Sequence, residues 1–183
     1  PAATLICHPR GLRHMVDPSQ LWASATAVYG IDEMRRSYGE LVPVPAERAR
    51  PSSDEMVLDL AGRPLRLIDT PGHAKHHHCI WDARSRGWFT GDTFGLSYRE
   101  FDVAGRAWAL PTSTPVQFDP EAMKTSIARM MAAEPECLYV THYGRVTEVP
   151  RLAALLNGLI DRMAALARQA QAERHARLKS GLP

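Results

Sequence analysis

Two histidines and one aspartate stand in sequence contexts from which they could bind a metal ion. His73 ends a Thr-Pro-Gly-His stretch, Asp92 lies within Phe-Thr-Gly-Asp-Thr, and His142 lies within Val-Thr-His-Tyr-Gly. Imidazole nitrogens and carboxylate oxygens are ligands that Zn²⁺ accepts, and hydrolytic zinc sites keep one position open for water. Water bound to such an ion ionises near neutral pH. These residue types suit a hydrolytic metal site, but the three residues lie far apart in the sequence, and a single histidine is more often a surface or hydrogen-bonded residue, so the motifs around them carry the argument.

Each of the three residues follows a segment that we expect to form a β-strand. Runs of apolar and β-branched residues bounded by turn residues predict strands over 56–60, 65–68, 79–83, 88–90 and 138–140. The second of these leads to His73, the fourth to Asp92 and the last to His142. Because layered α/β folds bring the ends of distant strands to one rim, the three side chains can share a site there.

Helix signals separate these strands. Asp17-Pro18 and Asp119-Pro120 each combine an N-cap carboxylate with a proline at the first helical position. Pro135 must end the second of these helices near residue 134. We expect helices over 17–30, 31–38 and 119–134, a short strand over 4–8, a turn at 10–11 and a proline-broken connection over 42–53.

An apolar stripe continues after Pro150. Leucine, methionine and alanine recur there at three- and four-residue spacing, which predicts a long amphipathic helix. We therefore expect one domain over residues 1–149 and a helix over 150–183 that packs on this domain or on a partner subunit. The latter arrangement would give a homodimer.

The amino-acid composition and the charge are those of a globular protein and argue against several functions. The 183 residues are 45% hydrophobic and 23% charged, as in globular proteins, and the formal net charge is +2. This charge, without a basic stripe, argues against nucleic-acid binding, and the lack of a long apolar run argues against membrane insertion. The three cysteines contain no Cys-x-x-Cys pair, so we expect neither a disulfide framework nor a cysteine-based zinc site, and we expect a cytoplasmic protein.

The three ordered motifs around His73, Asp92 and His142 resemble those of the metallo-β-lactamase superfamily. Two further stretches are similar to a hydrolase subgroup related to the glyoxalase II branch: His8-Pro9-Arg10-Gly11 through Asp17-Pro18, and Pro111-Thr112 through Phe118-Asp119-Pro120. The resemblance covers roughly residues 4–165 and implies a four-layer αββα sandwich of the α/β class, together with an enzymatic function.

The same resemblance implies a role for each candidate ligand. His73 would complete the first metal's histidine set, Asp92 would be the catalytic carboxylate that bridges two metals, and His142 would complete the second set. The cofactor would be one or two Zn²⁺ ions, with iron and manganese as alternatives. The substrate would be a small ester, thioester, lactone or amide.

The sequence departs from the family at its signature His-x-His-x-Asp-His, which it lacks. The run His76, His77 and His78 follows the Thr-Pro-Gly-His turn instead of preceding it, and no Asp-His comes after it. We therefore expect an N-terminally truncated version of the fold, whose remaining ligands precede residue 1. If the chain has no such segment, three ligands cannot fill two coordination shells.

Further residues lie close to the ligand motifs in the sequence. At least one of His76, His77 and His78 is expected to orient a ligand from behind. Phe94, Tyr98 and Tyr143 either line a substrate pocket or pack in the interior.

Three other functions compete with a hydrolase. A phosphodiesterase or nuclease is disfavoured by the charge. An iron-dependent oxidoreductase resembling the sulfur dioxygenases would use the same kind of site, and metal analysis would distinguish it. A non-catalytic truncated domain acting through its C-terminal helix is favoured by the missing signature alone.

Overall fold

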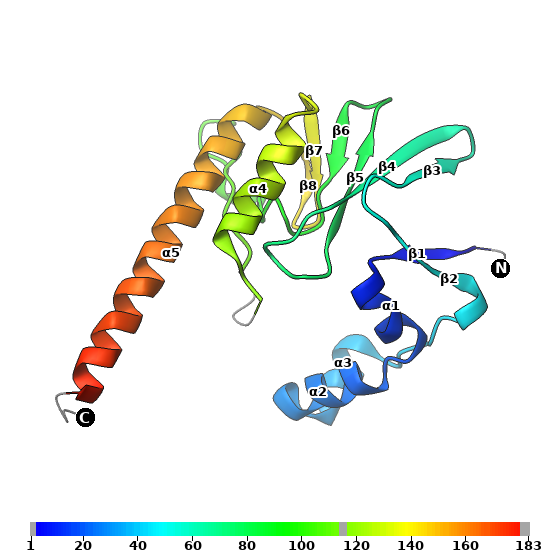
Figure 1. Cartoon of the computed structure of the whole chain (residues 1–183), viewed down its shortest axis with the longest axis horizontal. Helices are drawn as coiled ribbons and strands as arrows, with labels where there is room; N and C mark the ends of the chain where they lie inside the picture. Colours follow the sequence, from blue (N-terminus) through cyan, green and yellow to red (C-terminus); the bar gives the residue numbers. More distant parts are fainter. Residues whose placement is uncertain (1–2, 114–116, 180–183) are drawn as a thin grey trace. The chain divides into compact units, whose positions relative to one another are not determined.

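The computed structural model describes residues 3–113 and 117–179, and the chain divides into two compact units, residues 1–56 and 57–183. The first unit is mainly helical, and the second contains a six-stranded sheet with two helices (Figure 1). The α/β class predicted from the sequence is confirmed.

The first unit is built on two short parallel strands. Its elements are β1 (Leu5–Cys7), α1 (Pro9–Val16), α2 (Ser19–Tyr29), α3 (Ile31–Tyr38), the 3-10 turn η1 (Ala46–Arg48) and β2 (Ala49–Pro51). β1 pairs with β2, and because parallel strands cannot be joined by a tight turn, the helices form the crossover between them. Within the described part of this unit, Met34 is the one buried hydrophobic residue.

Two local predictions for this unit are wrong. The turn expected at residues 10–11 lies inside α1, because His8 caps that helix through a hydrogen bond from Arg10 N–H to its Nδ1 (3.2 Å), and Pro9 is the first helical residue. The connection expected over 42–53 contains η1 and β2. The helices predicted over 17–30 and 31–38 are confirmed as α2 and α3.

The second unit is organised by one sheet in which the strands follow each other in sequence order. Its strands are β3 (Val57–Leu60), β4 (Arg63–Asp69), β5 (His78–Asp82), β6 (Gly87–Phe89), β7 (Cys137–Val140) and β8 (Gly144–Val146). Neighbouring strands are antiparallel except β6 and β7, which are parallel. The connection between β6 and β7 carries the 3-10 turn η2 (Arg99–Phe101) and α4 (Pro120–Met131). The predicted strands are confirmed, and β8 is an addition to them.

The turn between β3 and β4 shows why these residues form a hairpin. Ala61 and Gly62 both have positive φ angles, 53° and 82°, as a two-residue type I′ turn requires. Asp59 stabilises the turn by accepting a hydrogen bond from Gly62 N–H on Oδ1 (2.9 Å). Gly62 occupies one of the two positions with positive φ, and Ala61 occupies the other.

Two helices pack against the sheet and form the core. Asp119 caps α4 by accepting a hydrogen bond from Ala122 N–H (3.0 Å), as the Asp-Pro pair predicted. Trp88 of β6 is fully buried and donates from Nε1 to the carbonyl of Met130 (2.9 Å), which ties the sheet to α4. The first turns of α5 (Val149–Lys179) bury Leu152, Leu156 and Ile160 in the same core.

The helix predicted after residue 150 is present as α5 and belongs to the second unit. Beyond residue 164 its described side chains are exposed, Leu166 to 65% of its surface. A partner subunit on this part of α5 stays a prediction. In the described ranges of the chain, no helix has the length and apolar character needed to cross a bilayer.

Candidate metal centre

The sheet topology brings the three candidate ligands to one edge. β4 and β6 are each antiparallel to β5, and β6 is parallel to β7, so β4, β6 and β7 all run in the same direction. His73, Asp92 and His142 each follow the C-terminal end of one of these strands. The shared rim expected from the sequence is therefore present.

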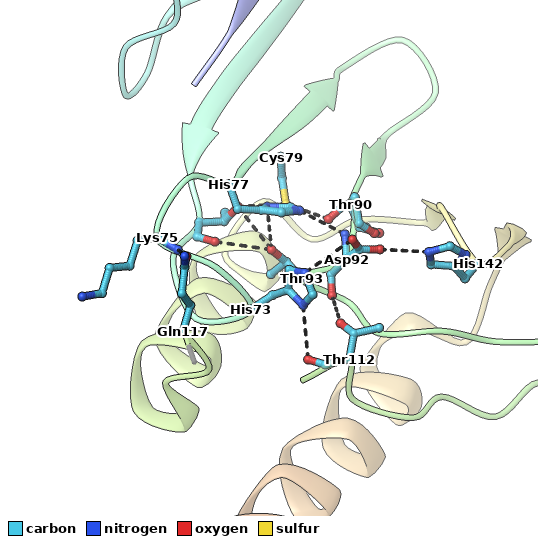
Figure 2. A network of polar contacts seen from close by, with 12 residues as sticks. His73, Lys75, His77, Cys79, Thr90, Asp92, Thr93, Thr112, Gln117 and His142 are labelled. Atoms are coloured by element: carbon cyan, nitrogen blue, oxygen red, sulfur yellow. Dashed lines mark hydrogen bonds and ion pairs between the residues drawn. The ribbon is translucent and has the colours of Figure 1, made fainter. Parts of the chain in front are cut away.

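Asp92 lies between the two histidines and directs a different oxygen toward each (Figure 2). Its Oδ2 is 3.5 Å from Nε2 of His73, and its Oδ1 is 3.4 Å from Nε2 of His142. Donor atoms about 2.0–2.2 Å from a tetrahedral Zn²⁺ lie roughly 3.4 Å from one another. Each histidine–oxygen pair therefore has the separation of two ligands of one ion, and the carboxylate is placed to serve two ions.

One oxygen of this carboxylate has an unsatisfied hydrogen-bonding capacity. Oδ1 of Asp92 is buried and accepts no hydrogen bond from any residue that the structure describes. A buried acceptor without a donor is unfavourable unless another positive group satisfies it. The donor types and this oxygen fit a cation.

The three donors do not form a complete site by themselves. Among residues 3–113 and 117–179, no group of three or more histidine, cysteine, aspartate or glutamate side chains converges on one ion position. Two ions in tetrahedral sites need more ligands than these three residues supply. The structure shows two histidine–oxygen pairs that share one carboxylate, that of Asp92.

His73 has the tautomer that a ligand to the cation would need. Its Nδ1 lies 3.4 Å from the carbonyl oxygen of Thr112, which can only accept, so the proton is assigned to Nδ1. This leaves the lone pair on Nε2, the atom that faces Asp92. A backbone carbonyl in this position orients the ring.

The turn that carries His73 depends on a close approach to α4. Gly72 has a φ of 135°, and a Cβ atom at this position would lie 2.3 Å from Cα of Met123. Two hydrogen bonds hold the turn against the helix: Asp119 N–H donates to the carbonyl of Gly72 (2.8 Å), and Ser126 Oγ donates to that of Pro71 (2.7 Å). Only glycine fits here.

The backbone of Asp92 is held on both sides. Its N–H donates to Nε2 of His77 (3.0 Å), and its carbonyl accepts from the hydroxyl of Thr112 (2.6 Å) and from Gly95 N–H (3.1 Å). Figure 2 shows both side chains converging on Asp92. Neither Thr112 nor the individual role of His77 was predicted from the sequence; the signal for His77 was its place in the histidine run.

His77 lies in a polar environment behind the ligands. Its Nδ1 is 2.9 Å from the hydroxyl of Thr70 and 2.9 Å from that of Thr93. Burial, and next the charge that His73 would carry, lower the pKa of His77 to about 4. His77 is therefore neutral at physiological pH.

The neighbouring residues of the run occupy different positions. His76 is exposed, and His78 is the first residue of β5, paired with Asp69 of β4. The thiol of Cys79 donates to the carbonyl of Thr90 (3.2 Å), and burial raises the pKa of this thiol to about 12. Cys79 is thus a buried, protonated thiol, which is unsuited to act as a nucleophile.

The three aromatic candidates are not equivalent. Phe94 is 1% exposed and belongs to the core, which agrees with the second of the two alternatives, packing in the interior. Tyr98 and Tyr143 meet edge to face with ring centroids 5.3 Å apart, and Tyr143, next to His142, is 52% exposed. Phe101 is a further exposed aromatic residue and lies on the connection between β6 and β7. The sequence analysis did not single it out.

A cavity of about 710 Å³ lies elsewhere, in the first unit. It contains none of the three candidate ligands and is lined by residues of α2, α3 and the adjoining loops, including Trp22, Arg35 and Glu40. Because it brings together no set of metal donors, the chemistry is assigned to the edge of the sheet.

Known proteins resemble this chain in sequence and in fold. The model of the metallo-beta-lactamase superfamily matches residues 3–142. A curated relative, the metallo-beta-lactamase fold-containing protein ST1585 of Sulfurisphaera tokodaii, is 33% identical over 89 residues, which are 49% of this chain and 30% of the relative. The solved structure of ST1585 from Sulfolobus tokodaii matches with a TM-score of 0.67 and 25% identity, over 88% of this chain and 58% of that chain.

Two more distant structures share the fold. TTHA1429 from Thermus thermophilus, a metallo-beta-lactamase family protein, has a TM-score of 0.53 at 18% identity. The match covers 97% of this chain and 55% of the TTHA1429 chain. The chemotaxis sensor ODP of T. denticola, solved as a diiron species, has a TM-score of 0.55 at 15% identity. This match covers 86% of this chain and 59% of the ODP chain. The chain spans less than two thirds of each of these proteins. The family model matches residues 3–142, and the motifs and the sheet of this chain agree with that match. The chain therefore belongs to the metallo-beta-lactamase superfamily.

Proposed function

We propose that this chain carries half of the active site of a metal-dependent hydrolase that acts on a small ester, thioester, lactone or amide. The observation that supports this most directly is the position of Asp92, with one oxygen 3.5 Å from His73 Nε2 and the other 3.4 Å from His142 Nε2. A carboxylate placed in this way suits two cations that act together on one substrate.

The chain's own residues have separate tasks in this proposal. Asp92 holds the two histidine–oxygen pairs at a fixed separation, and His73 and His142 each complete one of them. A cation bound there supplies Lewis acidity, which lowers the pKa of water and polarises the scissile carbonyl. The hydrogen bond from His73 to Thr112 keeps the lone pair of Nε2 directed at the site. Zn²⁺ is the proposed cofactor, as one or two ions.

The exposed aromatic surface beside His142 is the proposed contact for the substrate. Tyr143 is 52% exposed and is supported edge-on by Tyr98, so its ring is held in place while one side stays accessible. Aromatic rings of this kind bind apolar parts of small molecules at low entropic cost. A small molecule is therefore the proposed partner.

Metal analysis of the purified chain tests the proposal. The full chain, its His73→Ala and Asp92→Asn variants and the control His76→Ala are loaded with zinc, desalted and analysed for bound metal and for cleavage of ester, thioester, lactone and amide substrates. Because each histidine–oxygen pair supplies two protein donors, we expect weak binding, with the wild type and the control holding more zinc at a given free Zn²⁺ concentration than the two ligand variants. Equal metal content in all four proteins would contradict the ligand assignment, and a wild type that holds two zinc ions per chain but cleaves none of the substrates would contradict the hydrolase.

An iron-dependent oxidoreductase is the alternative on the same site. Imidazole and carboxylate suit iron as well as zinc, and a structure with this fold, the sensor ODP, is a diiron species. Comparison of zinc and iron in the protein as isolated from cells grown with both metals distinguishes the two. Iron in excess, together with oxygen consumption, would favour the oxidoreductase.

The proposed compartment is the cytoplasm. Cys7, Cys79 and Cys137 are all free thiols in the structure, as a reducing environment favours. Alkylation of thiols in freshly lysed cells checks this, since three reactive thiols after denaturation agree with it and oxidised cysteines do not.

A further inference from the structure

We propose that His77 is a positioning residue that fixes the Asp92 carboxylate between His73 and His142. It does so by accepting the Asp92 N–H on Nε2 while its own Nδ1–H is held by two threonine hydroxyls. This inference rests on the proposed metal site and assigns to one residue of the histidine run a role that its neighbours do not share.

The hydrogen bonds assign one tautomer to the ring. A backbone N–H can only donate, so Nε2 of His77, 3.0 Å from Asp92 N, must carry the lone pair. The proton therefore sits on Nδ1, which lies 2.9 Å from Oγ1 of both Thr70 and Thr93. Both hydroxyls can accept from this nitrogen, and Thr93 Oγ1 is also 3.4 Å from the carbonyl of Thr70, to which it can donate. Each polar atom of the ring thus has a partner.

Packing fixes the plane of the ring as well. Gly91 has a φ of 49°, and a Cβ atom at this position would lie 2.3 Å from Nε2 of His77. The ring also meets that of His73 edge to face, with centroids 6.0 Å apart. The imidazole of His77 therefore contacts Gly91 and the N–H of Asp92 on the connection after β6, and the candidate ligand His73 on its own connection between β4 and β5.

This contact determines where the carboxylate points. The side chain of Asp92 has two χ angles, so its two oxygens can face two different histidines only if its backbone is held in one orientation. His77 holds the N–H of this residue, and Thr112 holds its carbonyl. Without His77, the N–H of Asp92 loses its acceptor, and the turn keeps the hydrogen bonds from Thr93 N–H to the carbonyl of Thr90 and from Thr90 Oγ1 to that of Gly91.

Two substitutions at residue 77 separate positioning from general structure. In His77→Gln the amide oxygen can take the place of Nε2 as acceptor for Asp92 N–H, whereas His77→Ala offers no acceptor. His76→Ala removes an exposed histidine from the same run and is the matched control. Zn²⁺ affinity of the full chain is measured by competition with a chromophoric chelator, and folding is followed by circular dichroism.

We expect His77→Ala to bind Zn²⁺ about 10–100-fold more weakly, as is typical when a group that orients a ligand is lost. His77→Gln should recover most of this loss, and His76→Ala should bind as the wild type does. Unchanged affinity in His77→Ala, or an equal loss in the alanine and glutamine variants when both are folded, overturns the proposal.

A measurement on the metal-free wild type keeps the inference testable if the variants do not fold. Long-range ¹H–¹⁵N correlation spectra report which imidazole nitrogen carries the proton, and we expect the Nδ1–H form for His77. The Nε2–H form would contradict the hydrogen bond to Asp92 and with it the inference. A wild type that binds neither zinc nor iron but shows the Nδ1–H form would contradict the proposed function while leaving the contact between His77 and Asp92 intact.

Discussion

Thr112 forms a hydrogen bond to Asp92 through its side-chain hydroxyl and contacts the imidazole of His73 through its backbone carbonyl. Its hydroxyl donates to the carbonyl of Asp92 (2.6 Å), and its own carbonyl lies 3.4 Å from Nδ1 of His73. A single residue from the connection between β6 and α4 therefore orients two of the three proposed ligands. Together with His77 on the other side, it encloses the backbone of Asp92.

Thr112→Val tests this link. Valine keeps the shape of threonine but loses the hydroxyl, so the carbonyl of Asp92 keeps only Gly95 N–H as a donor among the described residues. We expect Zn²⁺ affinity to fall, and we expect the free energy of unfolding to fall by about 1 kcal/mol, the usual contribution of one hydrogen bond. Urea denaturation and chelator competition measure the two effects. Thr125→Val, an exposed position on α4, is the control and should bind Zn²⁺ as the wild type does.

Binding of the metal itself should stabilise the fold. A ligand that binds only the folded chain adds about 2.7 kcal/mol at a concentration of 100 Kd, which raises Tm by roughly 5–10 °C in a protein of this size. We expect the Tm of the wild type to rise with Zn²⁺ and to return after chelation. In Asp92→Asn the increment should be much smaller, because the amide loses the negative charge and one of the two oxygens that face the histidines. An equal rise in both proteins would place the bound zinc elsewhere.

Gly72 and Gly158 form a matched pair of glycines. Gly72→Ala introduces a Cβ atom 2.3 Å from Cα of Met123 at a φ of 135°. We expect a loss of about 2–4 kcal/mol in the free energy of unfolding, because overpacking and backbone strain act together. Gly158→Ala, inside α5, meets no atom within 4 Å, and should stabilise the protein by up to about 1 kcal/mol. Thermal unfolding compares the two, and equal effects would show that the close approach of the turn to α4 is absent.

The buried carboxylate of Asp82 should make stability dependent on acid pH. Arg63 holds the pKa of Asp82 well below its usual range, and hydrogen bonds from Ser85 and from Arg84 N–H act in the same direction. The folded chain therefore binds this proton less readily than the unfolded chain, whose aspartates have a pKa of about 3.9. The stabilisation is complete above that value and is lost as pH falls below it toward the folded-state pKa.

Asp82→Asn should cost about 1–3 kcal/mol at pH 7, since it replaces a buried charge that accepts several hydrogen bonds and leaves Arg63 without its partner. The variant should also lose less stability than the wild type between pH 5 and pH 2. Asp161→Asn, whose side chain is 60% exposed in its pair with Lys124, is the control and should change little. A wild type and an Asp82→Asn variant with parallel pH profiles would contradict the role of the pair. Urea unfolding at a series of pH values provides the measurement.

The sequence alone was sufficient for most of the elements and for recognising the residue types that could bind a metal. Strand periodicity, the Asp-Pro helix starts and the apolar stripe after residue 150 correspond to elements of the structure because these signals are local and follow from backbone geometry and burial. The three donor residues were recognisable from their side chains and their motifs. The helix α1 was missed because its cap is a histidine, a residue type that rarely signals a helix start.

Only the tertiary structure decided how the site is put together. It determined that Asp92 offers one oxygen to each histidine, that His77 and Thr112 hold its backbone, and that Phe94 belongs to the core. These relations join residues from separate strand connections, and their distances depend on strand register and on the packing of α4 against the Gly72 turn. Sequence patterns report which side chains are present and which local conformation they favour, whereas the distance between two such side chains is set by the packed sheet as a whole.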